Sequence, residues 1–311
     1  MLISLILSSV LTFVELNCEN LFDTRHDSLK QDTEFLPEGA RYWTKTKYWR
    51  KLNNIGQEIL SCSDRLPDLV ALCEVENDTV LHDLTRRSLL RNAGYEYLMT
   101  ESRDLRGIDV ALLYQPVAFR PLCYEYIEVP LVKGMRPTRD ILYVQGLTLS
   151  FDTLHVFVVH APSRYGGEKA SRPYRLQVSN TLCKAISRLS NRNIIVAGDF
   201  NDYASSPALL QLEQNNLINV TKWKKGQTGL RGNYRYKGEW HSLDHILLSA
   251  SMAAHVDTAY IHAPTFLLEE DPQYGGFRPR RTFQGYRYRR GGFSDHLPLV
   301  VVLRRRESDP Q

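Results

Sequence analysis

The sequence predicts an α/β (α+β) protein in which two mixed β-sheets pack face to face and helices cover the outside. Short apolar runs bounded by polar residues, such as Ile-Ile-Val-Ala at 194–197, are typical of strands buried on both faces. Segments with apolar residues spaced by three and four alternate with such runs, which is the pattern of amphipathic helices. Strands buried on both faces need a covering layer on each side, so sheet against sheet with helices outside is the arrangement that accommodates both patterns.

The first half of the chain begins with these elements in order: a strand over 11–16, a loop over 23–44, a helix over 46–62, a strand over 68–73 and a helix over 77–91. The loop is polar and carries Pro37 and Gly39. In the first helix Trp49, Leu52 and Ile55 lie on one face. Gly94 is the expected stop of the second helix.

Strands then predominate, over 95–99, 108–114, 119–129, 141–151 and 154–160. A helix over 172–189 leads to the strand at 194–199, and the remaining elements are a short helix over 207–212 and strands over 233–236, 243–248, 255–260 and 299–303. The segment 274–292, rich in Arg and Gly, predicts a loop. No linker rich in Pro, Ser or Gly divides the chain, so we expect a single domain over 1–311 with a core of about 10–303.

The bulk composition is that of an ordinary globular protein. The 311 residues are 43% hydrophobic and 24% charged, with a formal net charge of +4, which excludes disordered and fibrous classes and favours anionic partners only slightly. Five scattered cysteines show no metal spacing and no disulfide framework. No apolar run reaches the ~20 residues of a membrane span, and no obligate protein partner is evident. The apolar N-terminus, 1–10, lacks a basic region; a cytoplasmic location is favoured, with a secreted or periplasmic one open if this segment is a signal remnant.

Polar side chains with catalytic potential follow several of the predicted strands. These are Asn17 with Glu19, Glu74, His160, Asp199 with Asn201, Asp244 with His245, and Asp295 with His296. A single Asp after a strand is ordinarily a turn or cap residue. Several independent strands that end in the same chemistry are harder to explain by turns, because strand ends in layered α/β folds meet at one edge, where sites form.

Six motifs, in this order, carry a resemblance to a known family: Leu-Asn-Cys-Glu-Asn-Leu-Phe at 16–22, Val-Ala-Leu-Cys-Glu-Val at 70–75, Val-His-Ala-Pro-Ser at 159–163, Gly-Asp-Phe-Asn-Asp at 198–202, Ser-Leu-Asp-His-Ile-Leu at 242–247 and Ser-Asp-His-Leu-Pro at 294–298. Together they resemble the endonuclease/exonuclease/phosphatase superfamily, which includes deoxyribonuclease I. The resemblance covers nearly the whole chain. It implies a four-layer α/β sandwich and metal-dependent hydrolysis of phosphoesters.

The resemblance also implies roles for individual residues. It implies that Glu74 is the principal ligand of Mg²⁺ or Mn²⁺, with Asn17, Glu19 and Asp295 nearby; Glu19 replaces a shorter Asp of some members. It implies that Asp199 and Asn201 orient the attacking water, that Asp244 orients His296, and that His160 is the general acid for the leaving oxygen. Arg139 corresponds to an arginine that is often near the scissile phosphate. Further candidates for substrate contact are Arg106, Arg164 and Tyr203.

The substrate is the open question at this stage. Arginine and tyrosine interleaved at 278–290, directly before Asp295, suit a nucleic-acid backbone with bases to stack, although a solvated basic loop has the same composition. A DNA or RNA nuclease is therefore the first hypothesis. The alternatives are a phosphatase or phosphodiesterase for a lipid head group or a small soluble phosphoester, and an inactive binding module, against which the complete set of candidate catalytic residues argues.

Overall fold

The computed structural model describes residues 10–149, 152–189, 193–222, 224–226 and 229–305. Most of the apolar N-terminal segment and the last two residues of the strand predicted over 141–151 lie outside this part. No described helix has both the length and the apolar character that a membrane span requires.

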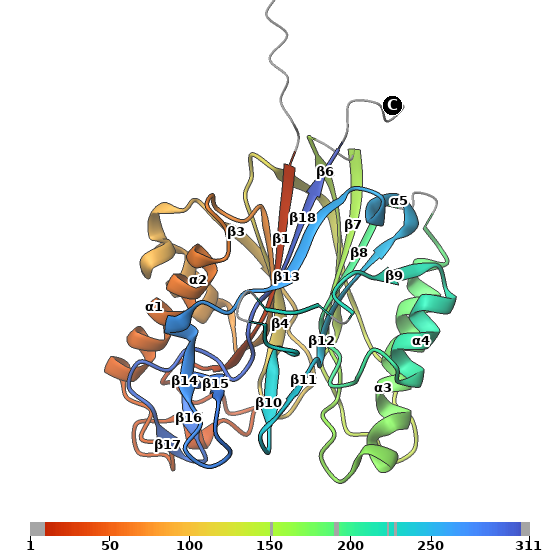
Figure 1. Ribbon diagram of the computed structural model, residues 1–311. Coiled ribbons are helices and arrows are strands. Elements are labelled where there is room, and N and C mark those ends of the chain that lie inside the picture. Colours follow the sequence, from red (N-terminus) through yellow and green to blue (C-terminus); the bar gives the residue numbers. More distant parts are fainter. Residues whose placement is uncertain (1–9, 150–151, 190–192, 223, 227–228, 306–311) are drawn as a thin grey trace, which may run out of the picture.

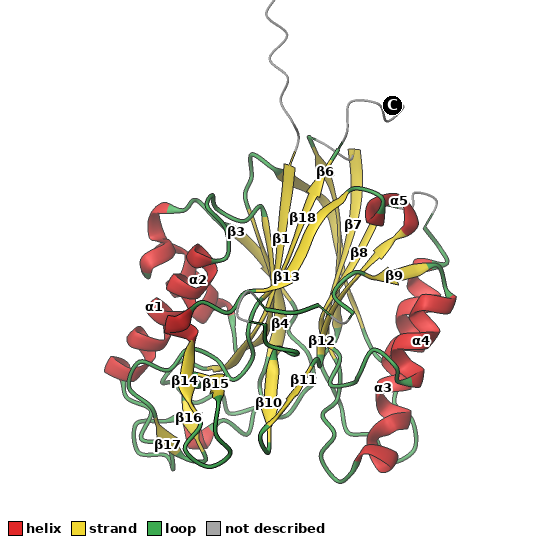
Figure 2. Cartoon of the chain, in the orientation of Figure 1, coloured by secondary structure: helices red, strands yellow, loops and turns green. Residues whose placement is uncertain are grey.

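Two six-stranded mixed sheets form the centre of the protein (Figures 1 and 2). The first contains, in spatial order, β13 (Val256–Ile261), β18 (Leu299–Arg304), β1 (Val10–Leu21), β2 (Leu69–Val75), β4 (Asp109–Tyr114) and β3 (Glu96–Met99). The second contains β5 (Phe119–Ile127), β6 (Ile141–Thr148), β7 (Asp152–His160), β8 (Ile194–Asp199), β12 (Asp244–Ser249) and β9 (Leu217–Asn219). Only the β1–β2 and β7–β8 pairs within these two sheets are parallel.

Helices cover the outer face of each sheet, on opposite sides of the molecule (Figure 2). The first sheet carries α1 (Lys45–Ser61) and α2 (Asp78–Arg86), and the second carries α3 (Glu168–Ile186) and α4 (Pro207–Gln214). Three apolar clusters separate the four layers. Phe13 and Val144 belong to the cluster between the sheets, and the two outer clusters join each sheet to its helices. The predicted α/β sandwich of two face-to-face sheets with helices outside is confirmed.

The helix predicted over 77–91 is interrupted. It ends at Arg86, and a separate 3₁₀ turn, Leu89–Asn92, begins after Ser88, whose extended backbone breaks the helix and whose side chain accepts a hydrogen bond from the Leu90 amide. The apolar periodicity continues through this break because both pieces face the same core, which explains why the sequence predicts one helix.

Several further strands of the structure have only two or three residues. They are β9, β10 (Tyr234–Tyr236), β11 (Glu239–His241), β14 (Leu268–Glu270), β15 (Phe277–Pro279), β16 (Phe283–Gln284) and β17 (Arg287–Tyr288). The predictions anticipated only β10 among them. The segment 274–292, predicted as a loop, contains β15, β16 and β17. Strands of two or three residues are too short for an alternating pattern to be visible.

Bulges shape the ends of β1 and β2. The pairing register shifts between Asn17 and Leu21 and between Cys73 and Val75, and the residues in the left-handed region there are Glu19 (φ 49°), Asn20 (φ 58°) and Glu74 (φ 63°). Because a bulge adds a residue to one strand only, it turns side chains away from the regular alternation. Because β1 and β2 run parallel, their polar ends lie at the same end of the molecule, opposite the end at which β1 begins (Figure 1).

Candidate active site

The predicted polar residues come together where the two sheets present their ends to the long loops. Asn17 and Glu74 come from the first sheet, and His160 and Asp199 come from the parallel neighbours β7 and β8 of the second. β12 runs antiparallel to β8, so Asp244 at its start lies opposite Asp199 at the end of β8. These side chains, which follow different strands in the sequence, therefore meet at one edge of the protein as expected.

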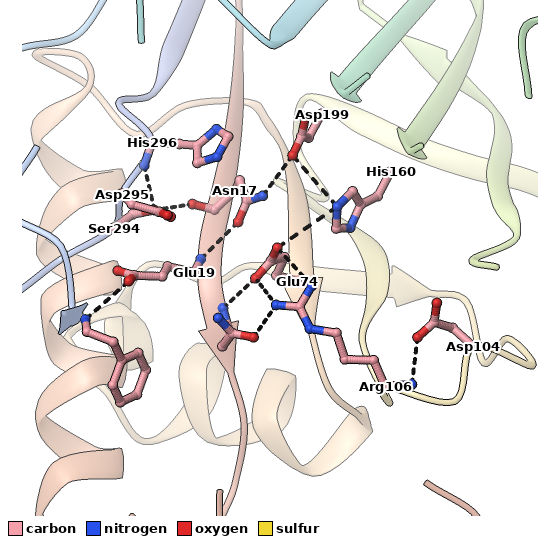
Figure 3. A network of polar contacts seen from close by, with 12 residues as sticks. Asn17, Glu19, Glu74, Asp104, Arg106, His160, Asp199, Ser294, Asp295 and His296 are labelled. Atoms are coloured by element: carbon pink, nitrogen blue, oxygen red, sulfur yellow. Dashed lines mark hydrogen bonds and ion pairs between the residues drawn. The ribbon is translucent and has the colours of Figure 1, made fainter. Parts of the chain in front are cut away.

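Glu74 lies at the centre of this network, between Arg106 and His160 (Figure 3). Its Oε2 accepts hydrogen bonds from the Asn20 amide at 2.8 Å and from the Arg106 guanidinium at 3.0 Å, and its Oε1 lies 3.9 Å from His160 Nε2. Burial alone would raise the pKa of Glu74, but the nearby positive groups, Arg106 foremost, outweigh it and hold the pKa at about 2. The carboxylate is ionised at neutral pH.

Asp199 joins the two sheets across the site. Its Oδ2 accepts from Asn17 Nδ2 at 3.1 Å and from Asn201 Nδ2 at 3.2 Å, and it lies 3.7 Å from His160 Nε2. Its Oδ1 accepts from the Asn201 amide at 2.7 Å. Burial, and after it the nearby carboxylate of Asp244, raise the pKa of Asp199 to about 7.

His296 forms a buried pair with Asp244. The distance from His296 Nδ1 to Asp244 Oδ2 is 2.6 Å, and Asn233 Nδ2 donates to the same oxygen. The ring of Tyr234 lies against the imidazole with 4.7 Å between ring centroids. The sequence predictions include neither Asn233 nor Tyr234, which stand in a region with no motif of the resemblance; their only signal was the strand expected over 233–236.

The two imidazoles of the site have opposite protonation tendencies. Burial would lower the pKa of His296, but Asp244 outweighs burial and raises this pKa well above its ordinary value. For His160, burial and the charge of Arg139 act in the same direction, and the pKa falls well below its ordinary value. One charged and one neutral imidazole thus lie near Asp199, and such a pair can supply one proton donor and one proton acceptor.

Glu19, predicted to lie near the metal ion, has its carboxylate turned towards another segment (Figure 3). Its Oε2 accepts the Thr282 amide at 2.5 Å, its Oε1 accepts the Phe283 amide at 3.1 Å, and Arg281 Nε lies 3.4 Å from Oε1. Arg281 also pairs with Asp295 at 3.0 Å. Both oxygens of Glu19 hold the segment 281–283 in place, which leaves Glu19 poorly disposed to bind an ion.

The four predicted substrate contacts occupy two sides of the site. Arg106 pairs with Glu74, and Arg139 is buried, where it pairs with Asp104 at 3.0 Å and donates to the Ala161 carbonyl at 2.8 Å. Arg139 thus supports the residue that follows His160. On the other side Arg164 lies over the ring of Tyr203, 4.0 Å from its centroid.

The donor chemistry of the site fits a hard divalent cation. Ionised Glu74 and the amide oxygen of Asn17 are the kind of ligands that Mg²⁺ and Mn²⁺ take. Asp199, Asp244 and His296 form a second group whose ligand atoms lie within 4.8 Å of one another. In this group the 2.6 Å bond uses Asp244 Oδ2 and His296 Nδ1, and Asp244 Oδ1 is buried without a hydrogen-bond partner among the described residues. Two neighbouring sets of side chains thus offer ligands for an ion, Glu74 with Asn17 and the group of Asp199, Asp244 and His296.

Comparison with known proteins identifies the family. The family model of the endonuclease/exonuclease/phosphatase family matches residues 12–305, and the chain belongs to this family. No curated protein sequence matches the chain significantly. The family is named for nucleases and phosphatases, both of which hydrolyse phosphoesters. The class of enzyme expected from the six motifs is therefore supported, whereas the choice between nuclease and phosphatase is not decided.

Solved structures with the same fold have low sequence identity to this chain. An endonuclease/exonuclease/phosphatase family protein of Bacteroides thetaiotaomicron is 16% identical, with a TM-score of 0.65 over 95% of this chain and 97% of that chain. A mannosyl-6-phosphatase of the same organism is 17% identical, with a TM-score of 0.61 over 94% and 98%. TDP2 of D. rerio, complexed with a single-strand DNA product, is 15% identical, with a TM-score of 0.56 over 94% and 98%.

Proposed function

We propose that the protein is a divalent-metal-dependent phosphodiesterase that acts on nucleic acid. The observation that carries this proposal is that Asp199 lies close to both imidazoles. His160 Nε2 lies 3.7 Å from Asp199 and 3.9 Å from Glu74, and ligand atoms of Asp199, Asp244 and His296 lie within 4.8 Å of one another. A phosphodiester is an anion with a poor leaving group, and its hydrolysis needs charge neutralisation together with proton transfer at two oxygens.

Each residue of the site has a task in this proposal. Glu74 and Asn17 hold the divalent cation, which neutralises phosphate charge when bound; Asp295 is a further ligand. Asp199 and Asn201 orient the attacking water, and neutral His160 accepts its proton. Charged His296, held by Asp244, donates a proton to the leaving oxygen. This assignment gives the proton donor to His296, whereas the family resemblance implies it for His160.

The direct test is hydrolysis of plasmid DNA, single-stranded DNA, RNA and bis-p-nitrophenyl phosphate with Mg²⁺, Mn²⁺ or a chelator. We expect cleavage of the polynucleotides that the chelator abolishes and that His296→Ala reduces by ~10²-fold or more. The control is His82→Ala, a solvent-exposed histidine of α2, which should leave the rate unchanged. Cleavage that neither the chelator nor His296→Ala reduces would contradict the proposal.

A second candidate is a phosphatase for a small phosphoester, because one structural relative is a mannosyl-6-phosphatase with a TM-score of 0.61. The two functions differ in their response to salt. Polynucleotide cleavage falls steeply with added salt, since phosphate contacts displace bound counterions, and turnover of a small phosphoester does not.

A further inference from the structure

A large basic and aromatic pocket lies beside the candidate active site. It has a volume of about 570 Å³, within the ~300–1,000 Å³ of ligand pockets. Its walls come from the loop after β8, the segment before β10, and β11. Among the described residues that line it, four are cationic, Lys222, Lys224, Lys225 and Arg231, and none is acidic.

The positive charge of this pocket is largely uncompensated. Lys222 pairs with Glu213 at 3.1 Å. Lys224, Lys225 and Arg231 are exposed, and within the described part of the chain no carboxylate forms an ion pair with them. Cations gathered around a concave surface create a positive potential that attracts an anion, and several of them suit a ligand with more than one negative charge.

Aromatic rings form the rest of the pocket wall. Tyr203 has the guanidinium of Arg164 4.0 Å from its ring centroid and the ring of His241 at 5.4 Å with an interplanar angle of 28°. His241 and the half-buried Trp240 both line the cavity. Burial lowers the pKa of His241, so this ring is neutral at pH 7 and can stack without bringing a charge. A flat aromatic ligand could extend this stack.

Two connections join the pocket to the catalytic residues. Tyr203 stands two positions after Asn201, on the same loop. His241 pairs with Tyr234 across the β10–β11 hairpin, and Tyr234 in turn forms a β-bridge with His296 and packs on its ring. Tyr234 therefore links the imidazole of His296 to His241 in the pocket wall, so that a chain of nucleotides with its scissile phosphate at His296 has the pocket next to it.

We propose that this pocket binds a nucleotide of single-stranded nucleic acid next to the scissile phosphate, with an unpaired base on the His241–Tyr203 stack and neighbouring phosphates on Lys224, Lys225 and Arg231. The inference rests on the proposed function, which it narrows to a polynucleotide substrate with unpaired bases. Aromatic stacking accepts any base, so the pocket contributes affinity and strand preference and little sequence specificity.

Binding of a fluorescent single-stranded oligonucleotide, measured by anisotropy in the presence of a chelator, tests this pocket without catalysis. The test variant replaces Lys224, Lys225 and Arg231 by Gln. We expect it to bind at least tenfold more weakly and to reduce the slope of log affinity against log salt by about 2, since each phosphate contact to a single strand contributes ~0.7. His241→Ala should also weaken binding, by about tenfold.

The matched control removes the same charge elsewhere, with Arg120, Lys184 and Arg188 replaced by Gln. All three are exposed. Arg120 lies at the start of β5, at the far end of the second sheet, and Lys184 and Arg188 lie in the last turn of α3 and just after it, ~28 Å along this 19-residue helix from its end near His160. This control should bind as the wild type does. Equal losses in both triple variants would reduce the effect to net charge and overturn the proposal, as would equally effective competition by duplex DNA.

The outcome is separable from that of the proposed function. If the test variant keeps its oligonucleotide affinity while the wild type hydrolyses bis-p-nitrophenyl phosphate, the pocket assignment is wrong and the hydrolase assignment stands. If the test variant loses affinity and the wild type hydrolyses no phosphoester, the pocket stands and the function fails. In an active enzyme, the Michaelis constant of the test variant should rise more for single-stranded DNA than for bis-p-nitrophenyl phosphate.

Discussion

Glu74 and Glu19 come from neighbouring parallel strands, and their carboxylates meet different partners. Glu74 faces the two site histidines and Arg106, whereas Glu19 accepts two backbone amides and pairs with Arg281. Sequence position alone does not distinguish them, since each follows an apolar strand and each lies in a motif of the family. The distinction depends on Thr282, which is 263 positions from Glu19 and carries no signal of its own.

Substituting the two glutamates separates their roles. Glu74→Gln should raise the Mn²⁺ concentration for half-maximal activity by tenfold or more, because the amide lacks the negative charge that an ion requires. Glu19→Gln should leave that concentration unchanged and lower the free energy of unfolding by ~1–3 kcal/mol, because it weakens hydrogen bonds to buried amides. Metal titrations of activity and urea unfolding measure both effects. A weakened metal response in Glu19→Gln alone would place the ion at Glu19.

The two histidines differ in how their loss depends on the leaving group. If His296 donates the proton to the leaving oxygen, His296→Ala should slow cleavage of an alkyl phosphodiester by ~10²–10⁴-fold and slow bis-p-nitrophenyl phosphate much less, because nitrophenolate leaves without a proton. His160→Ala should slow both substrates to a similar degree, because each needs an activated water. The measurement is the rate of each variant on each substrate. If instead His160→Ala slows the alkyl substrate much more than bis-p-nitrophenyl phosphate, and His296→Ala slows both equally, His160 is the general acid.

At the scale of elements, the junction of β7 and β8 sets the position of Asp199. Gly198 has φ 144°, and a Cβ there would lie 1.8 Å from the Val159 carbonyl oxygen. Only glycine allows the two backbones to approach in this way. The residues that follow Val159 and Gly198 in the chain are His160 and Asp199, which pair with each other and belong to the site.

Gly198→Ala should therefore destabilise the protein severely, by more than ~3 kcal/mol, since backbone atoms would have to move. The control is Gly94→Ala, which also has positive φ (72°) but no atom within 4 Å of the added methyl group, so it should cost only ~1 kcal/mol. Thermal unfolding of both variants provides the comparison. Similar losses of stability in the two variants would show that Gly198 is needed because of its positive φ, and not because of the close approach of the Val159 carbonyl oxygen.

The elements that the sequence predicts well are those with enough length for a pattern to show. β8 is an apolar run buried along its whole length, and α1 has a clear apolar face. The bulges of β1 and β2 have no comparable signal, because Glu19, Asn20 and Glu74 adopt left-handed backbone without being glycine. The pattern indicates where each strand is, and the bulge decides where its last side chains point.

At the scale of the whole molecule, the layer order is predictable because burial patterns identify which faces need a cover. The sequence pattern does not indicate which ionisable side chains are buried. Glu58 and Lys51 both lie on the inner face of α1, where Lys51 donates to Thr282 Oγ1 at 2.6 Å and neither carboxylate oxygen of Glu58 has a hydrogen-bond partner. Burial raises the pKa of Glu58 to about 8, although Lys51 opposes the shift.

This buried acid should make the stability of the whole protein depend on pH. The folded state keeps Glu58 protonated up to its raised pKa of about 8, whereas in the unfolded chain the side chain ionises near the ordinary glutamate pKa of 4.5. The contribution of protonated Glu58 to the free energy of unfolding is thus fully present below pH 4.5. It is lost as the pH rises to 8, at ~1.4 kcal/mol per pH unit. Urea titrations of Glu58→Gln and the wild type between pH 5 and 8.5 measure this effect. Over this range the free energy of unfolding of the variant should rise relative to that of the wild type by several kcal/mol, so that high pH favours the variant. The control is Glu38→Gln at an exposed position, whose free energy of unfolding should change with pH as that of the wild type does. If the free energy of unfolding of Glu58→Gln also changes with pH as that of the wild type does, Glu58 is ionised in the folded protein across this range.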